Sequence, residues 1–171
     1  MVMTVLISCN RDDGSKNGFI PDDYSSWTRL NREELNYPIP GHMSNYRIVY
    51  INKTGEDPDI TERGDELSYS FPEGTIIVKE VYHGLEIEEE DKPFQLTVMI
   101  KDPNNSQARG GWLWVVKDLE TNEETVFTHE FCVTCHANAN EKHPYGDENP
   151  KEEFRDYVFF ASDVKTDNGT E

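Results

Sequence analysis

The residues with the most recognisable chemistry are two cysteines and a histidine in the stretch Cys132-Val133-Thr134-Cys135-His136. Two cysteines separated by two residues and followed directly by a histidine form the pattern by which c-type haem is attached. In that chemistry each thiol adds to one vinyl group of the porphyrin, and the histidine coordinates the iron as its proximal ligand. The stretch therefore predicts one covalently attached haem c, bound through Cys132, Cys135 and His136, with His136 as the metal ligand.

Two other interpretations use the same side chains. Zinc accepts mixed sets of cysteine and histidine ligands, and such a set is available in His129, Cys132, Cys135 and His143. Two cysteines at this spacing also form redox-active dithiols. Because c-type haem is attached outside the cytoplasmic membrane of bacteria, an exported chain favours haem over zinc.

The start of the chain resembles a bacterial lipoprotein signal. A short apolar run ends in Leu6-Ile7-Ser8-Cys9, which is similar to the lipobox whose cysteine is lipidated and becomes the mature N-terminus. The run departs from the usual signal, since it is short and no lysine or arginine precedes it; the alternative is an apolar first strand. We expect a periplasmic or otherwise exported protein, held to the membrane only by a lipid on Cys9, with residues 1–20 as signal and tether.

Composition narrows the set of partners. The chain of 171 residues is long enough for one domain and carries 16 lysines and arginines against 34 aspartates and glutamates, a formal net charge of −18. Nucleic acid and anionic membrane surfaces would repel such a chain, so neither is expected as a partner. Lipidated Cys9 and two haem-linked cysteines account for all three cysteines, so no disulfide is expected.

The chain before the motif has the pattern of a β-sheet. Runs rich in β-branched and aromatic residues occupy 46–51, 74–82, 94–100, 112–117 and 125–127. The connections between them are short and lack crossover helices, which favours an antiparallel meander. We expect a mainly β (α+β) domain built on a single antiparallel, curved β-sheet with a few short helices, one of which carries the Cys-x-x-Cys-His motif.

The remaining segments predict short elements and a loose end. Capping residues before regularly spaced aromatic residues predict a short helix in 21–30, and the polar stretch 52–64 predicts no more than a helical turn. The motif itself is expected on a helix over 130–140. The domain is expected to span 21–162, followed by a disordered tail at 163–171.

Two charged residues stand inside expected strands. The alternation of a strand places Lys79 on the same face as Ile77 and Val81, and Arg47 on the same face as Val49 and Ile51. A lysine or arginine among apolar neighbours indicates a specific role. The alternatives are a lysine whose ammonium reaches solvent and an arginine that pairs with one of the many acids.

These residues together resemble the cytochrome P-460 family. The resemblance rests on five stretches in order: Tyr46 to Asn52, Phe71 to Glu80 with its Pro-x-Gly-Thr-x-x-x-Lys-Glu pattern, Gly110-Gly111-Trp112, Cys132 to Ala137, and Asp156 to Phe159. The resemblance covers most of residues 42–160. It implies a small antiparallel β protein that is often dimeric and holds one c-type haem with a five-coordinate iron.

The resemblance also implies site residues and an activity. In cytochrome P-460 a lysine nitrogen is bonded to the porphyrin edge, and the position of Lys79 makes it the candidate for that residue. Arg47 is the candidate for an arginine that hydrogen-bonds the bound nitrogen ligand. Cytochrome P-460 itself oxidises hydroxylamine, so the resemblance implies as partners a small nitrogenous substrate, or a gas such as nitric oxide, and an electron acceptor protein. The related cytochromes c′-beta lack the lysine bond and bind nitric oxide or carbon monoxide; the family's pocket carboxylate matches no single acid here.

Plain electron transfer is the other haem function to weigh. An electron carrier would need a sixth iron ligand, for which the formal candidates are His42, Met43, His83 and Met99. Nothing in the sequence around these residues singles one out.

Overall fold

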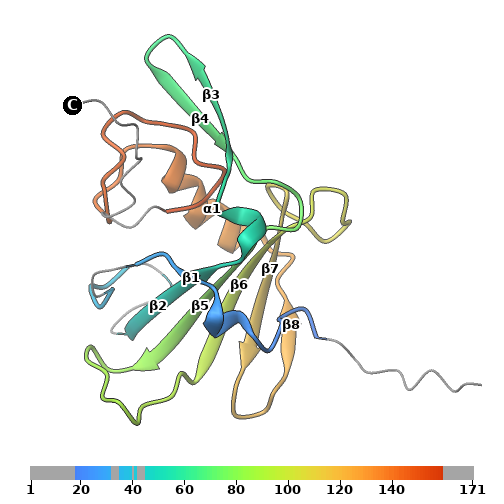
Figure 1. The fold of residues 1–171 in the computed structure, drawn as a ribbon, viewed down its shortest axis with the longest axis vertical. Helices are drawn as coiled ribbons and strands as arrows, with labels where there is room; N and C mark the ends of the chain where they lie inside the picture. Colours follow the sequence, from blue (N-terminus) through green and yellow to red (C-terminus); the bar gives the residue numbers. More distant parts are fainter. Residues whose placement is uncertain (1–17, 32–34, 40, 42–44, 160–171) are drawn as a thin grey trace, which may run out of the picture.

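The main body of the protein is one antiparallel sheet. The computed structural model describes residues 18–31, 35–39, 41 and 45–159. Its six-stranded sheet has the order β1-β2-β5-β6-β7-β8 and does not close into a barrel (Figure 1). The strands are β1 (Thr28–Arg29), β2 (Asn45–Ile51), β5 (Ile76–His83), β6 (Gln95–Lys101), β7 (Trp112–Asp118) and β8 (Glu124–Val126). The expected mainly β architecture with an antiparallel meander is confirmed.

Register assigns each side chain to one face of the sheet. Val49 of β2 lies opposite Lys79 of β5, Lys79 opposite Thr97 of β6, and Thr97 opposite Val116 of β7. Because directly paired residues of an antiparallel sheet point to the same side, these four side chains form one row across a single face. The expectation that Lys79 shares a face with Ile77 and Val81 follows from the same register.

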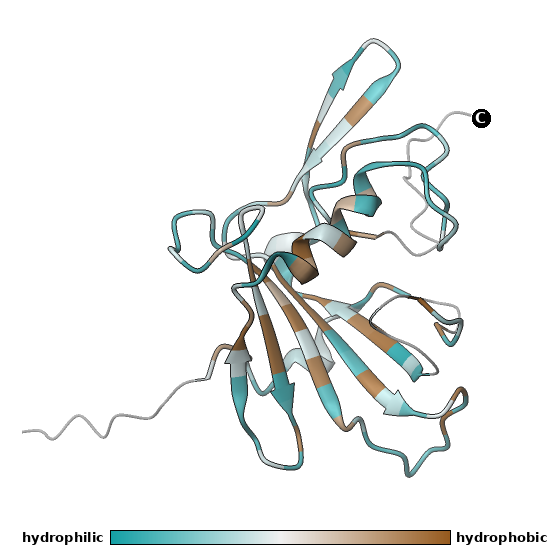
Figure 2. Ribbon diagram, turned by 180° about the vertical axis from the view of Figure 1, so that it is seen from behind, coloured by the Kyte–Doolittle hydropathy of each residue, from teal (hydrophilic) through white to brown (hydrophobic). Residues whose placement is uncertain are grey.

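Each face of the sheet is covered by a different part of the chain. The single α-helix of the described residues, α1 (Glu130–Ala137), covers one face, where Val133 packs with Ile77, Met99, Trp112 and Trp114. Residues 20–27, called the N-terminal segment below, cover the other face, where Ile20 packs with residues of β5, β6 and β7. Figure 2 shows the resulting alternation of hydrophobic and hydrophilic positions along the strands. The face covered by α1 is therefore the one that carries Lys79.

On the opposite face, a buried glutamate lies among tyrosines. Glu80 is buried and accepts hydrogen bonds from the hydroxyls of Tyr24 at 2.9 Å and Tyr82 at 2.8 Å. Burial, followed by the charge of Glu80 and the hydrogen bond to it, raises the phenol pKa of both tyrosines above the ordinary value. The same causes raise the pKa of Tyr50. The glutamate thus fixes the N-terminal segment to the sheet through neutral phenols.

A second, two-stranded sheet departs from the expectation of a single sheet. Strands β3 (Asp59–Arg63) and β4 (Glu66–Ser70) form a hairpin that projects from the body of the molecule (Figure 1). Every residue of β3 is exposed, and in β4 only Tyr69 is buried. The polar stretch 52–64 does contain the expected helical turn, the 3₁₀ helix η2 (Lys53–Gly55), but its second part begins this hairpin. A polar hairpin of this kind lacks the one-sided apolar pattern that identifies a strand.

Some of the segments expected near the two ends of the chain lie within the described residues, and others do not. The helix expected in 21–30 is a single 3₁₀ turn, η1 (Tyr24–Ser26), followed by the short edge strand β1. A further 3₁₀ turn, η3 (Asn138–Asn140), follows α1, so the helical segment expected over 130–140 is confirmed. Cys9 and the tail at 163–171 lie outside the described residues. Within the described ranges no helix is both long and apolar enough to cross a membrane.

Candidate functional site

Helix α1 presents both cysteines of the motif on one side. Cys132 and Cys135 are three residues apart, so their side chains lie on the same face of the helix. Both are free thiols and half-buried. Val133, which is buried between the helix and the sheet, anchors α1 to the core. The helix therefore holds two accessible thiols at the spacing that covalent haem attachment requires.

The ring of His136 is held in one orientation and one tautomer. Its Nδ1 lies 2.9 Å from the carbonyl oxygen of Tyr157. A carbonyl only accepts, so Nδ1 carries the proton, and the lone pair of Nε2 remains for a ligand. The ring also packs against Trp114, with centroids 4.7 Å apart, and Phe159, with centroids 5.4 Å apart. Burial, then the nearby charge of Lys79, lowers the pKa of His136 to about 4, which keeps the imidazole neutral.

The segment around Tyr157 is itself fixed by two side chains. Asp156 is buried, and its carboxylate accepts from the Lys101 ammonium at 2.6 Å and from the Phe71 backbone N–H at 3.0 Å. Asn140 Oδ1 accepts from the backbone N–H groups of Arg155 at 2.8 Å and Tyr157 at 3.1 Å. The segment 155–157, called the carbonyl strap below, thereby holds the Tyr157 carbonyl against His136.

The Tyr157 ring needs a glycine beneath it. Gly110 has a φ of +63°, and a Cβ at that position would lie 2.9 Å from Tyr157 Cε2 and 3.0 Å from Val133 Cγ2. The position thus demands both a left-handed backbone and the absence of a side chain. Gly64, with a φ of +65°, has the same backbone demand, but no atom lies within 4 Å of its Cβ position.

Gly110→Ala is expected to destabilise the protein by about 1–3 kcal/mol more than Gly64→Ala. Both variants strain a left-handed backbone, whereas only the first pushes on Tyr157 and Val133. Thermal unfolding of the two variants beside the parent measures the difference. Equal losses of stability would show that the contact with Tyr157 contributes nothing.

Lys79 faces the same region as the motif. It is half-buried in the middle of β5, in the row with Val49, Thr97 and Val116. Burial, followed by the positive charge of Arg47, lowers the pKa of Lys79 to about 7. Lys79 is therefore close enough to Cys132 and His136 for its charge to affect the pKa of both side chains.

Arg47 occupies the same face and is almost fully buried, at 2% exposure. Its side chain donates from Nε to the Leu35 carbonyl at 3.0 Å and from Nη2 to the Tyr37 carbonyl at 2.6 Å. Its guanidinium also lies 5.3 Å from the centroid of the Tyr37 ring. Arg47 thus holds the 35–37 segment against β2 while its charge acts on Lys79. Burial lowers the pKa of Arg47 itself.

The strand rows next to Lys79 are poor in carboxylates. In the described strands, the positions of the Lys79 row and of its two neighbouring rows on the same face are Arg47, Val49 and Ile51 in β2, Ile77 and Val81 in β5, Gln95, Thr97 and Met99 in β6, and Trp114 and Val116 in β7. The next row position in β7, Asp118, is exposed and accepts from the backbone N–H groups of Glu120 and Thr121. Its carboxylate caps that turn, so these rows offer no buried carboxylate as a proton acceptor beside Lys79.

The donor set fits a c-type haem. Two thiols lie on one side of α1, a histidine presents the lone pair of Nε2, and the facing sheet is apolar around Met99 and Trp114. Such a set supplies thioether bonds and one axial ligand. By contrast, no three histidine, cysteine, aspartate or glutamate side chains among the described residues gather in a way that could hold a metal ion. The cysteine and histidine side chains considered as zinc ligands are thus not gathered into a metal site in this part of the chain.

The candidates for a sixth iron ligand are placed as follows. Met99 is buried in the cluster with Trp114 and Val133, beneath α1. His83 is exposed at the end of β5, and its ring stacks on Phe94 with centroids 4.1 Å apart. His42 and Met43 lie outside the described residues. Of the two described candidates, Met99 is therefore packed in the core and His83 is stacked at the surface.

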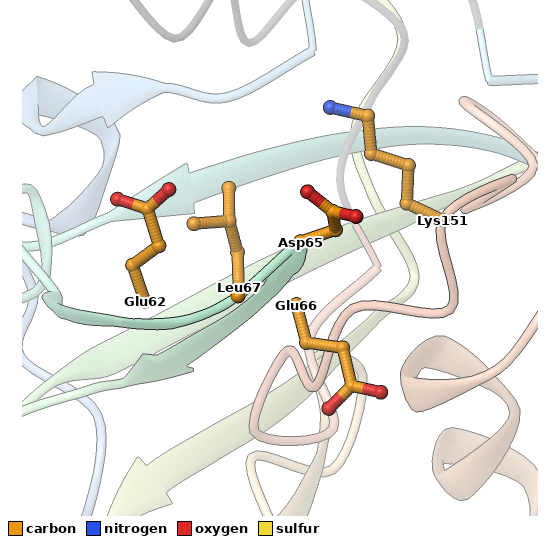
Figure 3. A pocket seen from close by; sticks show the side chains of 6 residues that line it. Glu62, Asp65, Glu66, Leu67 and Lys151 are labelled. Atoms are coloured by element: carbon orange, nitrogen blue, oxygen red, sulfur yellow. The ribbon is translucent and has the colours of Figure 1, made fainter.

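A separate hollow lies at the tip of the β3–β4 hairpin. Figure 3 shows the side chains that surround it, which belong mostly to the hairpin: Glu62, Asp65, Glu66, Leu67 and Lys151. None of the residues of the motif, and neither Lys79 nor Arg47, lines this hollow. The hollow is therefore separate from the residues of the motif and from Lys79 and Arg47.

Several residues that shape the site were not found from the sequence. Asp156, Tyr157 and Trp112 belong to stretches that carry the family resemblance, but their roles require the carbonyl strap to be seen in three dimensions. Asn140 gave no signal, since an asparagine after a helix is ordinarily a capping residue. The one usable signal was the stretch Asp156 to Phe159, which stands out against the polar sequence before it.

Comparison with known proteins gives one match. The model of the protein family described as Cytochrome P460 matches residues 21–160, which is most of the chain. No curated protein matches the chain. The matched range contains α1, all six strands of the main sheet and the carbonyl strap.

Proposed function

Because this chain belongs to the cytochrome P460 family, we propose that it is an exported c-type cytochrome with one covalently attached haem that oxidises hydroxylamine, nitric oxide or both. The family supports a haem protein. The covalent attachment, the iron ligand, the substrate and the reaction all belong to the proposal, and the positions of Cys132, Cys135 and His136 support it.

In this proposal Cys132 and Cys135 would form the two thioether bonds to the haem, and His136 would ligate its iron through Nε2. When bound, the haem supplies an iron that takes electrons from the nitrogen substrate and passes them to an electron acceptor protein. The protein contributes the orientation of His136 through the Tyr157 carbonyl, 2.9 Å from Nδ1. It also holds the ring by packing Trp114 and Phe159 against it.

The observation that carries the oxidase proposal is the position of Lys79. Burial and the charge of Arg47 lower its pKa to about 7, so that near neutral pH a large fraction of the side chain is a neutral amine. The neutral amine has the lone pair that a covalent bond to the porphyrin edge requires. Cys132 and His136 interact electrostatically with Lys79, which supports a position beside the attached group.

A second function, reversible binding of nitric oxide or carbon monoxide, is favoured by the poverty of carboxylates beside Lys79. Removing protons from hydroxylamine requires a base within hydrogen-bonding reach. The described strand rows offer Thr97, Gln95 and the amine of Lys79, and the carboxylate of Asp118 is engaged in its own turn. If Lys79 is not bonded to the haem, its neutral amine and these neutral groups suit an uncharged gas better than a substrate that loses protons.

The experiment that tests the proposal compares absorption spectra of the reduced holoprotein and a Lys79→Ala variant. A bond from lysine to the porphyrin changes its conjugation, so we expect an atypical c-type spectrum that becomes ordinary in the variant. The matched control is Lys117→Ala, because Lys117 is also half-buried in the sheet but pairs with Glu124 at 3.2 Å. An ordinary spectrum in the parent, unchanged by Lys79→Ala, would contradict the lysine bond and favour the gas-binding function.

Two further measurements on the same samples separate the remaining functions. Carbon monoxide added to the reduced protein should bind at once if the iron is five-coordinate, and slow or absent binding would instead indicate an electron carrier with a sixth ligand. Oxidation of hydroxylamine with an artificial electron acceptor should be lost in Lys79→Ala if the lysine bond is required. The Lys117→Ala control should retain both properties.

Export and membrane attachment are part of the same proposal. Covalent haem attachment outside the cytoplasmic membrane and a lipidated Cys9 together place the domain on a tether in the periplasm. A Cys9→Ser variant of the full chain is then expected in the soluble periplasmic fraction, while the parent stays with the membrane fraction. Identical distribution of the two proteins would contradict the lipid anchor.

A further inference from the structure

We propose that Asp156 is a positioning residue for the axial histidine: its ion pair with Lys101 locks the carbonyl strap, and so sets the strength of the hydrogen bond from His136 Nδ1 to the Tyr157 carbonyl. This inference rests on the proposed role of His136 as iron ligand. It adds a residue, outside the Cys-x-x-Cys-His motif, that controls the properties of the bound group without contacting it.

The ion pair between Asp156 and Lys101 is largely buried. Asp156 is 4% exposed, and the side chain of Lys101, from the end of β6, is 12% exposed. A buried ion pair adds little to stability over an apolar pair, but losing one partner leaves an uncompensated charge. The two residues are 55 positions apart in the chain, so the pair fixes the strap to the sheet at one point.

Several hydrogen bonds converge on Asp156. Besides Lys101, its carboxylate accepts from the Phe71 backbone N–H at 3.0 Å and from Trp112 Nε1 at 3.3 Å. Trp112 Nε1 also donates to the backbone carbonyl of Asp156 at 2.9 Å. Lys101 in turn lies 4.9 Å from the centroid of the Trp112 ring. Side chain and backbone of Asp156 are therefore both held by groups on β6, β7 and the end of β4.

The backbone of the carbonyl strap adopts an unfavourable conformation. Asp156 has a φ of +51° and Tyr157 a φ of +69°. Two consecutive non-glycine residues in the left-handed region are unfavourable, so this conformation persists only where surrounding contacts impose it. The contacts of Asp156 and of Asn140 impose it. The product of that strained conformation is the direction of the Tyr157 carbonyl, which points at His136 Nδ1.

The consequence concerns the ligand strength of His136. A hydrogen bond from Nδ1–H to an acceptor fixes the ring and raises the basicity of the other nitrogen. A stronger donor nitrogen stabilises oxidised iron and lowers the reduction potential. Loosening the strap should therefore weaken the iron–histidine bond and raise the reduction potential, even though no residue that touches the haem is changed.

The test uses the holoprotein with Asp156→Asn, which keeps the shape of the side chain and removes the charge that Lys101 neutralises. We expect the iron–histidine stretching band of the reduced protein to move to lower wavenumber, and the midpoint potential to rise. The matched control is Glu124→Gln, which removes the other half-buried ion pair of the sheet, Lys117 with Glu124. The control should leave both the band and the potential unchanged.

A second pair of variants keeps the test decisive if Asp156→Asn does not fold. Asn140→Ala removes the oxygen that accepts from Arg155 and Tyr157, whereas Asn140→Asp retains an oxygen at that place. The alanine variant should shift the band in the same direction, and the aspartate variant should restore the parental position. Such rescue distinguishes positioning of the carbonyl from a general loss of stability.

The outcomes separate this inference from the proposed function. A folded Asp156→Asn holoprotein and a folded Asn140→Ala holoprotein that both retain the parental band and potential would overturn the inference and leave His136 as ligand. A parent holoprotein without any iron–histidine band would overturn the ligand assignment, and with it this inference. A shift in the Glu124→Gln control equal to that in Asp156→Asn would also overturn the positioning role.

Discussion

Replacing both Cys132 and Cys135 by serine is expected to convert a protein that keeps its haem in denaturant into one that releases it completely. In the folded protein both thiols lie on the same side of α1 and are half-buried and free. A thioether bond survives unfolding, whereas the bond from His136 to iron is lost when the fold that positions it is lost. Haem-dependent staining after denaturing electrophoresis, and extraction with acidified organic solvent, measure the change.

The single variants make this prediction sharper. Either Cys132→Ser or Cys135→Ser alone leaves one thioether bond, so haem should remain attached in denaturant, with a spectrum shifted by the one unreacted vinyl group. Thr134→Ser, at an exposed position between the two cysteines, is the matched control and should behave as the parent. Haem that stays with the double variant in denaturant would contradict attachment through these cysteines.

The sheet could be predicted from the sequence because its strands follow the simplest pattern. β6 alternates strictly, with Leu96, Val98 and Ile100 in the cluster beneath the N-terminal segment and Met99 in the cluster beneath α1. β5 and β7 have apolar residues on both faces and therefore do not alternate strictly, but they are rich in β-branched and aromatic residues and are bounded by turns. Physical periodicity was thus sufficient for the strands that form the core.

The hairpin β3–β4 could not be predicted in the same way because it buries almost nothing. Its strands are held by backbone pairing from Asp59 with Ser70 to Arg63 with Glu66, and by the approach of Phe154 to Leu67 and Tyr69. The one local signal was Gly64-Asp65, a dipeptide that suits a two-residue turn because Gly64 adopts a φ of +65°. Read as a turn between strands, it would have indicated the hairpin.

The candidate site shows the same division between pattern and three-dimensional context. Cys132, Cys135 and His136 are local in sequence, so their spacing alone predicted an arrangement on one helix. Lys79 could be assigned to a face because a strand alternates. The carbonyl strap, by contrast, is held in place by residues from four other stretches of the chain. Its conformation also depends on left-handed backbone at non-glycine positions, which no sequence pattern indicates.

Arg47 illustrates how a correct position can carry an additional role. From the sequence, its alternatives were an arginine of the pocket and a partner for an acid. The bonds described for its side chain go to the backbone carbonyls of Leu35 and Tyr37, while its charge depresses the pKa of Lys79. One buried cation can therefore hold a segment in place and also help to keep a neighbouring amine neutral. The sequence could not indicate the first role, because residues 35–37 contain no charged group that would pair with an arginine.

The tyrosines around Glu80 lead to a prediction about alkaline pH. Tyr24 and Tyr82 donate their hydroxyl protons to the buried carboxylate, so a phenolate at either position would lose that bond and face a negative charge. Burial and Glu80 raise the pKa of both phenols in the folded chain above the ordinary value near 10. Below that value both the folded and the unfolded chain hold these protons, and the full contribution to stability is present.

As the pH rises above about 10, the unfolded chain releases these protons while the folded chain retains them, so the free energy of unfolding should fall. The two tyrosines together lower it by at most about 2.8 kcal/mol for each pH unit, because one pKa unit corresponds to about 1.4 kcal/mol per group. A Tyr24→Phe, Tyr82→Phe variant should lose less stability between pH 9 and pH 11 than the parent, as measured by denaturant unfolding at each pH. A double variant of two exposed residues, Ser25→Ala with Ser26→Ala, serves as control and should follow the parent. Parallel pH profiles for the parent and the phenylalanine variant would show that the phenols near Glu80 titrate normally, and that the N-terminal segment is held to the sheet by apolar packing alone.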